Sequence, residues 1–221
     1  MYFPVTSPIL ALFALFLLAM LAFVEVGVLE IAYEKLGIPH RTVMLLLFTM
    51  IVGSYINIPI HKIPVETLIQ DRIVSFWGVP YVVPHADDPH YTVIAVNVGG
   101  ALIPAAICLF LLFTNKVLLS AAAATAVVAA VVYHFSRIVP GVGIAVPTLI
   151  PGVLAAGAAY VFNRRQAPIV AYIAGTMGCL LGADIMNLAL MPSLSAPVAS
   201  IGGAGTFDGV FVSGVIAVLL V

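Results

Sequence analysis

Long apolar runs, separated by short polar segments, follow one another along most of the sequence. A run of about 20 predominantly apolar residues is long enough to cross a bilayer as an α-helix. The pattern predicts an all-α fold, a polytopic transmembrane bundle with about seven spans. The expected spans are at about 8–33, 41–60, 92–113, 117–135, 142–162, 168–191 and 207–221. The last run is short for a span, so we expect part of 200–206 to enter the membrane with it.

The longest polar stretch, at about residues 61–91, separates the second and third expected helices. We expect it to form an extramembrane loop, and the chain 1–221 to form a single transmembrane domain. The cluster HADDPH, at 85–90, contains imidazole and carboxylate groups that could ligate a metal. Its spacing matches no specific metal motif, so a solvated loop is the expectation. The sequence predicts no metal site and no cofactor.

Composition supports an integral membrane protein. Hydrophobic residues make up 63% of the 221 residues and charged residues 8%, and the mean hydropathy is +1.23. Soluble domains carry about 25% charged residues. The net charge of -1 says nothing about partners, but the sequence has no basic patch for nucleic acid, so the lipid bilayer is the expected partner. Oligomerisation is left open. Cys108 and Cys179 fall inside apolar runs and are interpreted as small packed hydrophobic residues.

Lysine and arginine are distributed unevenly between alternate loops. Cytoplasmic loops of membrane proteins carry an excess of these residues. With the N-terminus outside, the inward loops hold Lys35, Arg41, Lys116, Arg164 and Arg165, and the outward loops hold Lys62, Arg72 and Arg137. This distribution favours an outside N-terminus and an inside C-terminus.

Two aspartates, Asp184 and Asp208, lie in the last two apolar segments. A carboxylate at the centre of a hydrophobic helix costs on the order of 3 kcal/mol on insertion scales, so each is a candidate for a functional site. Asp184 is about 24 Å up the sixth helix at 1.5 Å per residue, which is the depth at which the seventh helix begins. The two carboxyl groups could therefore meet. At about 3 Å they would share one proton, so that one activates water and the other polarises a carbonyl.

Three glycines shortly before Asp208 and two asparagines in apolar segments are the candidate substrate-binding residues: Gly202, Gly203, Gly205, Asn97 and Asn187. The glycines would leave backbone free for the approach of an extended substrate. Asn97 has two interpretations, a hydrogen-bonding residue between helices or a residue that lines the site.

The segment GTFDGVFVSG around Asp208 resembles the second catalytic aspartate region of intramembrane aspartyl proteases, the presenilin and signal peptide peptidase group. In that group a Gly-x-Gly-Asp motif opens a helix, and Asp184 would match the aspartate on the preceding helix. The resemblance covers about 40 residues and implies catalytic roles for Asp184 and Asp208 in cleaving a transmembrane peptide. The chain departs from the group at Phe207, where glycine is expected, and at Ala183, where tyrosine is expected.

Four segments, INIPI, AVNVGGALIP, GADIMNL and APVASIGGAGTFDGVFVSGVIAVLL, resemble a prokaryotic family of multi-pass membrane proteins described as domain of unknown function 1614. This resemblance spans nearly the full chain. It implies an integral protein of the prokaryotic inner membrane and supplies no activity.

Two other functions fit the same residues. The first is a transporter or channel for a small solute, proton or cation, because discontinuous helices with glycine and proline carry substrate sites in transporters. The second is a non-enzymatic membrane assembly partner, in which Asp208 caps the seventh helix and Asp184 bonds a neighbour within the bundle.

Overall fold

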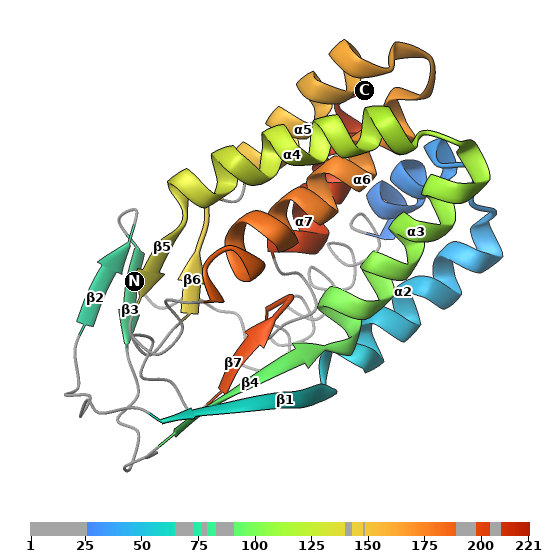
Figure 1. Ribbon diagram of the computed structural model, residues 1–221. Helices are drawn as coiled ribbons and strands as arrows, with labels where there is room; N and C mark the ends of the chain where they lie inside the picture. Colours follow the sequence, from blue (N-terminus) through green and yellow to red (C-terminus); the bar gives the residue numbers. More distant parts are fainter. Residues whose placement is uncertain are drawn as a thin grey trace, which may run out of the picture.

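The computed structural model describes residues 26–64, 73–76, 79–82, 91–139, 143–147, 149–188, 198–203 and 209–221 (Figure 1). A helix at Val26–Lys35 precedes the labelled helices. These are α2 (His40–Ser54), α3 (Ile103–Asn115), α4 (Leu118–Phe135), α5 (Leu149–Phe162), α6 (Ala167–Cys179) and α7 (Gly209–Leu219). The strands are β1 (Asn57–Pro64), β2 (Ile73–Phe76), β3 (Val79–Val82), β4 (Tyr91–Asn97), β5 (Arg137–Val139), β6 (Gly143–Ala145) and β7 (Val198–Ile201).

Helix α6 is the centre of the bundle, in contact with α3, α4, α5 and α7 (Figure 1). Two glycines let α4 approach closely: Gly178 near the end of α6, and Gly182 in the π-helical segment that continues it. A Cβ on Gly178 would lie 2.6 Å from the side chain of Val128. A Cβ on Gly182 would lie 2.4 Å from the carbonyl oxygen of Ala129. Small residues allow such backbone contact between membrane helices. On its other side, α6 receives a hydrogen bond of 3.0 Å from the Ser213 hydroxyl of α7 to the Gly175 carbonyl.

Three helical segments in the described part of the chain are long and apolar enough to cross a membrane: Val98–Asn115, Leu118–Phe135 and Arg164–Ile185. The helices Val26–Lys35 and His40–Ser54 meet at 119° and provide a fourth if they form one broken span. Helices α5 and α7 are apolar but have only 14 and 11 residues. The prediction of a mostly helical membrane protein is confirmed, whereas the count of seven spans is not.

The all-α prediction was wrong in its detail, because strands replace helix in three of the expected spans: β1 in the second, β4 in the third and β6 in the fifth. The second expected helix ends at Ser54 and continues as β1. The third begins as strand β4, YTVIAVN, and turns helical only at Val98. Four of the seven β4 residues are β-branched, and such side chains favour a strand over a helix. The polar segment expected at 61–91 holds part of β1, then β2 and β3.

Strands β1, β4 and β7 form one sheet, in that order. β1 runs antiparallel to β4, and β4 runs parallel to β7 with Val96 opposite Ile201. The parallel pairing brings the carboxyl ends of β4 and β7 together, although the two strands are about 100 residues apart in the chain. Each is followed by a glycine pair and then by a helix. The other two sheets are the antiparallel pairs β2–β3 and β5–β6.

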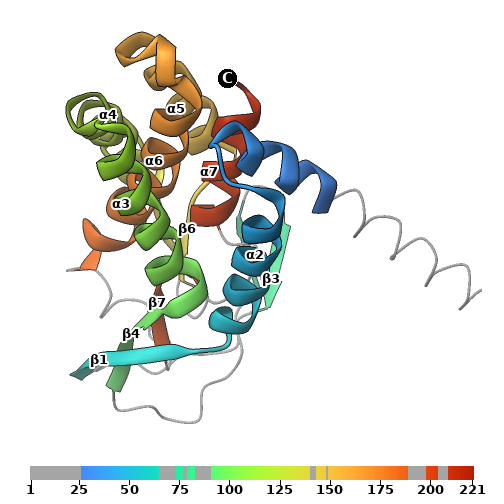
Figure 2. The same ribbon diagram turned by 90° about the vertical axis from the view of Figure 1, so that its right-hand side faces the viewer.

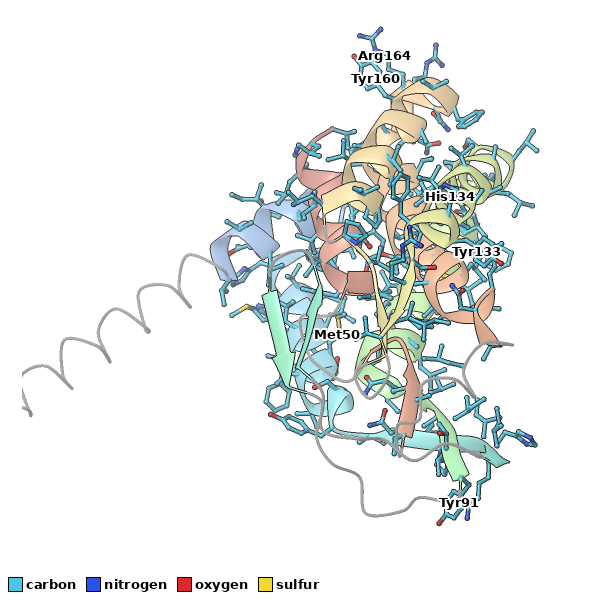
Figure 3. All side chains as sticks on the ribbon, turned by 90° about the vertical axis from the view of Figure 1, so that its left-hand side faces the viewer. Met50, Tyr91, Tyr133, His134, Tyr160 and Arg164 are labelled. Atoms are coloured by element: carbon cyan, nitrogen blue, oxygen red, sulfur yellow. The ribbon has the colours of Figure 1, made fainter. Side chains whose placement is uncertain are left out.

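The bundle has two chemically different ends (Figure 2). At one end the ammonium group of Lys35 donates to the carbonyl oxygens of Val218, Leu219 and Val221 at 3.1 to 3.4 Å, close to the C-terminus. The loops that carry Lys116 and Arg164 also meet at this end, through a 3.4 Å hydrogen bond from Gln166 to the Asn115 carbonyl. The β1–β4–β7 sheet lies at the other end (Figure 2). Figure 3 shows the same separation, with Arg164 over the ring of Tyr160 at one end and Tyr91 at the other.

Candidate functional site

Asp184 lies at the sheet end of the central helix. It belongs to a π-helical segment, Leu180–Ile185, that continues α6, and its side chain is half-buried. Its Oδ2 atom accepts the backbone N–H of Gly202 at 2.7 Å. Asp184 is the next-to-last residue of the apolar segment Arg164–Ile185. The carboxylate therefore lies near the end of a span, where a charge costs less than at the bilayer centre.

The helix end that carries Asp184 is closed by Asn187. The Nδ2 group of Asn187 donates to the carbonyl oxygens of Gly182 and Ala183 at 3.1 and 2.9 Å, and to the Ser136 hydroxyl at 3.0 Å. The last carbonyls of a helix lack intrahelical partners, and side-chain donors of this kind satisfy them. Asn187 is buried, so these contacts position the turn around Asp184. A role in substrate binding remains a prediction.

The Gly202 N–H that donates to Asp184 belongs to a two-glycine turn that follows β7. Gly202 and Gly203 have φ values of +83° and +73°, a region that glycine enters without steric cost. The turn is packed directly on the backbone that links β4 to α3, since a Cβ on Gly100 would lie 1.9 Å from the carbonyl oxygen of Gly202. Glycine at 100 and 202 is therefore required by backbone contact. The predicted contact of Gly202 and Gly203 with substrate is untested.

Asn97 is fully buried where β4 becomes helical. Its Nδ2 group donates to the Ser54 carbonyl at 2.7 Å and to Oδ1 of Asn57 at 3.1 Å, and its Oδ1 accepts the Gly100 N–H at 2.7 Å. Asn97 thus joins the end of α2 to the start of the π-helical segment Val98–Leu102. These bonds favour the first of the two interpretations from the sequence, a hydrogen-bonding residue between elements.

Asp208 and Gly205 lie outside the described residues, but the residue that follows Asp208 is described. Gly209 begins α7, and a Cβ on it would lie 3.9 Å from the Sγ atom of Cys179 on α6. Cys179 precedes Asp184 by five residues on the same continuous helix. Gly209 is therefore held beside α6 near the end that carries Asp184. Whether the two carboxylates meet is a prediction.

The geometry can be compared with known proteins. A family model described as "Protein of unknown function (DUF1614)" matches residues 51–220, which is more than half of the chain. The chain belongs to the DUF1614 family. No curated protein and no solved structure matches it. Asn97, Asp184, Gly202 and Asp208 all lie within the part of the chain that defines this DUF1614 protein.

Two residues of the site, Asn57 and Ser200, were missed by the sequence analysis. The Ser200 hydroxyl donates to Oδ1 of Asn57 at 2.6 Å, and the same oxygen accepts from Asn97. The available signal was an asparagine between isoleucines at the end of an apolar run, INIPI. That signal suggested only the end of a helix. It could not reveal a partner 143 residues away.

No group of three or more histidine, cysteine, aspartate or glutamate residues that could hold a metal occurs in the part of the chain that the structure describes. His85, Asp87, Asp88 and His90 lie outside that part. The described polar groups of this DUF1614 protein at the sheet end include the Asp184 carboxylate, the side chains of Asn57, Asn97, Asn187 and Ser200, and a glycine turn.

Proposed function

We propose that this DUF1614 protein is an intramembrane aspartyl hydrolase that cleaves a peptide bond with Asp184 and Asp208. The observation that supports this most is the hydrogen bond between Asp184 Oδ2 and the Gly202 N–H. It ties the end of the central helix to the segment that leads into Asp208, six residues later. Gly209 beside Cys179 restrains that segment from its other side.

The proposed reaction needs only the two carboxyl groups and water. One carboxylate removes a proton from water, and the resulting hydroxide attacks the carbonyl carbon of the peptide bond. The other carboxyl group, protonated, donates a hydrogen bond to the carbonyl oxygen. The tetrahedral intermediate then breaks its C–N bond, and the amine leaves with a proton from the pair. The half-buried position of Asp184 at the end of a span would give water access to it.

We propose seven spans for the full chain, with α5 and α7 crossing beside α6 despite their length. Helix α7 is bonded to α6 through Ser213, and α5 packs on both. The end that carries Lys35, Lys116 and Arg164 would face the cytoplasm of a prokaryotic cell. The N-terminus would then be outside, the C-terminus inside, and the Asp184 end in the outer half of the membrane. A transmembrane peptide is the proposed substrate class.

The hydrolase is tested with purified protein in proteoliposomes, a panel of transmembrane peptides and detection of products by mass spectrometry. Asp184→Asn and Asp208→Asn are each expected to reduce cleavage at least about 100-fold, since general acid–base catalysis contributes that much or more. Glu34→Gln is the matched control, because Glu34 is exposed on another helix. Cleavage at the wild-type rate by both aspartate variants would exclude the proposal.

A transporter is the second candidate, and the broken spans favour it. β4 interrupts one apolar segment, and the π-helical segment that contains Asp184 ends another. Non-helical backbone at membrane depth occurs where it is buried in protein or lines a cavity, and transporters place binding sites there. This function would be supported if the wild type moves protons or small cations into liposomes without cleaving peptides, and if Asp184→Asn and Asp208→Asn abolish that flux. Flux that both variants leave unchanged would exclude it.

A further inference from the structure

A short chain of hydrogen-bonded side chains joins all three strands of the β1–β4–β7 sheet. Asn57 begins β1, Asn97 ends β4, and Ser200 lies in β7. The Oδ1 atom of Asn57 accepts both from Asn97 Nδ2 at 3.1 Å and from the Ser200 hydroxyl at 2.6 Å. Asn97 is anchored in turn to the Ser54 carbonyl at the end of α2. The chain therefore links β7 to a buried, fixed residue.

Ser200 also controls the turn that reaches Asp184. Its carbonyl oxygen accepts the Gly203 N–H at 3.3 Å, which closes the turn containing Gly202. The Gly202 N–H is two residues beyond Ser200 and donates to Asp184 Oδ2 at 2.7 Å. β7 has only four residues, so it has little backbone pairing to fix its position. Movement of Ser200 would move the Gly202 amide.

We propose that Asn57 and Ser200 are positioning residues that hold the Gly202 N–H on the carboxylate of Asp184. Asn57 is exposed and Ser200 is half-buried, so neither fills the apolar core. Asn97 differs, since it is fully buried and its replacement would disturb the fold. The pair Asn57–Ser200 thus allows the orientation of Asp184 to be changed without removing a core residue. Its importance for catalysis rests on the proposed hydrolase function.

The sequence offers a direct probe of this arrangement. Ile201–Gly202 is the one Ile–Gly peptide bond in the chain. Protein labelled with ¹³C at the isoleucine carbonyl and ¹⁵N at glycine gives a single carbonyl–amide NMR correlation, that of Gly202. A short N–H bond to a carboxylate moves the amide proton downfield. Asp184→Ala removes the acceptor and is expected to move this signal upfield, which calibrates the loss of the bond.

Asn57→Ala and Ser200→Ala are expected to move the Gly202 signal in the same direction as Asp184→Ala. Ser200→Thr keeps the hydroxyl and Asn57→Asp keeps the acceptor oxygen, so both are expected to restore the wild-type position. Ser120→Ala is the control, because that hydroxyl bonds the Val117 carbonyl at the other end of the bundle. A wild-type signal in both the Asn57→Ala and Ser200→Ala variants, together with a shifted one in Asp184→Ala, would overturn the proposal. An unshifted signal in Asp184→Ala would overturn its premise.

The NMR measurement needs no substrate, so its failure is separate from failure of the hydrolase. If the wild type cleaves a peptide, Asn57→Ala and Ser200→Ala should reduce kcat by about 10- to 100-fold, the effect expected from misplacing a catalytic group by about 1 Å. KM should change little, and Ser200→Thr should recover kcat. A loss of kcat in the threonine variant equal to that in the alanine variant would contradict positioning through the hydroxyl.

Discussion

Replacement of Gly100 by alanine tests the contact on which the site is built. Gly100 lies where β4 becomes helical, and its missing side chain leaves space for the Gly202 carbonyl oxygen. A Cβ would lie 1.9 Å from that oxygen, and ordinary contact begins near 3.4 Å. The two backbones would have to separate by about 1.5 Å, the difference between these distances.

The magnitude follows from the two ways in which the protein can respond. If small shifts of the surrounding backbone absorb the added methyl group and the Gly202 bond survives, overpacking costs about 1–3 kcal/mol. If the Gly202 turn moves by the full distance, its 2.7 Å hydrogen bond to Asp184 is lost, and a hydrogen bond to a charged group is worth about 1.5–3 kcal/mol. Either response gives a loss of about 2 kcal/mol. For a chain of this size that lowers Tm by about 4–8 °C.

Thermal unfolding in detergent, followed by the fluorescence of a thiol-reactive dye on the buried cysteines, measures this loss. Gly157→Ala is the matched control, since Gly157 lies in α5 and a methyl group added there would meet no atom within 4 Å. Alanine favours a helix over glycine by about 1 kcal/mol, so the control should be neutral or stabilising. Equal Tm values for Gly100→Ala and Gly157→Ala would refute the backbone contact.

Two further predictions concern the packing of the bundle. The hydroxyls of Tyr33 and Tyr172 lie 3.3 Å apart and are buried, so Tyr33→Phe or Tyr172→Phe alone should cost about 0.5–1.5 kcal/mol in chemical denaturation, by removing the hydrogen bond between them. The double variant should cost less than the sum of the two, and strict additivity would show that the hydroxyls do not interact. Lys35→Met removes the donor to the last carbonyls of α7, and should speed hydrogen exchange of the C-terminal amides several-fold. Lys62→Met, at the other end, is its control, and equal exchange in both variants would contradict the capping role.

The sequence predicted helices well where an apolar run is long and uninterrupted. The run at 117–135 became α4 at Leu118–Phe135, and the run from 168 became α6 at Ala167–Cys179 with its π-helical continuation. The prediction failed at β4, because a short apolar run fits a buried strand as well as a helix. β4 pairs with β1 along its whole length and with β7 over four residues, and local patterns carry no information about either pairing.

The candidate site was predicted through its carboxylates and not through its geometry. Asp184 was identified because burying a charged residue in an apolar segment is costly, which makes it a candidate for a functional site. The structure adds a partner that the sequence analysis did not consider, the backbone N–H of Gly202. Every residue except proline has such an amide, so no residue type marks the one that matters. Asn57 and Ser200 were missed because their contact depends on the order of strands in the sheet.

The central claim is that Asp184 and Asp208 face each other, and a disulfide tests it most directly. Asp184→Cys and Asp208→Cys are combined in a chain with Cys108 and Cys179 changed to alanine, and mild oxidation is followed by mass spectrometry. A disulfide needs Cα atoms within about 7 Å. Gly209→Cys with native Cys179 is the positive control, since its Cβ would lie 3.9 Å from Sγ. The account predicts a disulfide in both proteins. A disulfide in the control alone would show that the two aspartates lie apart.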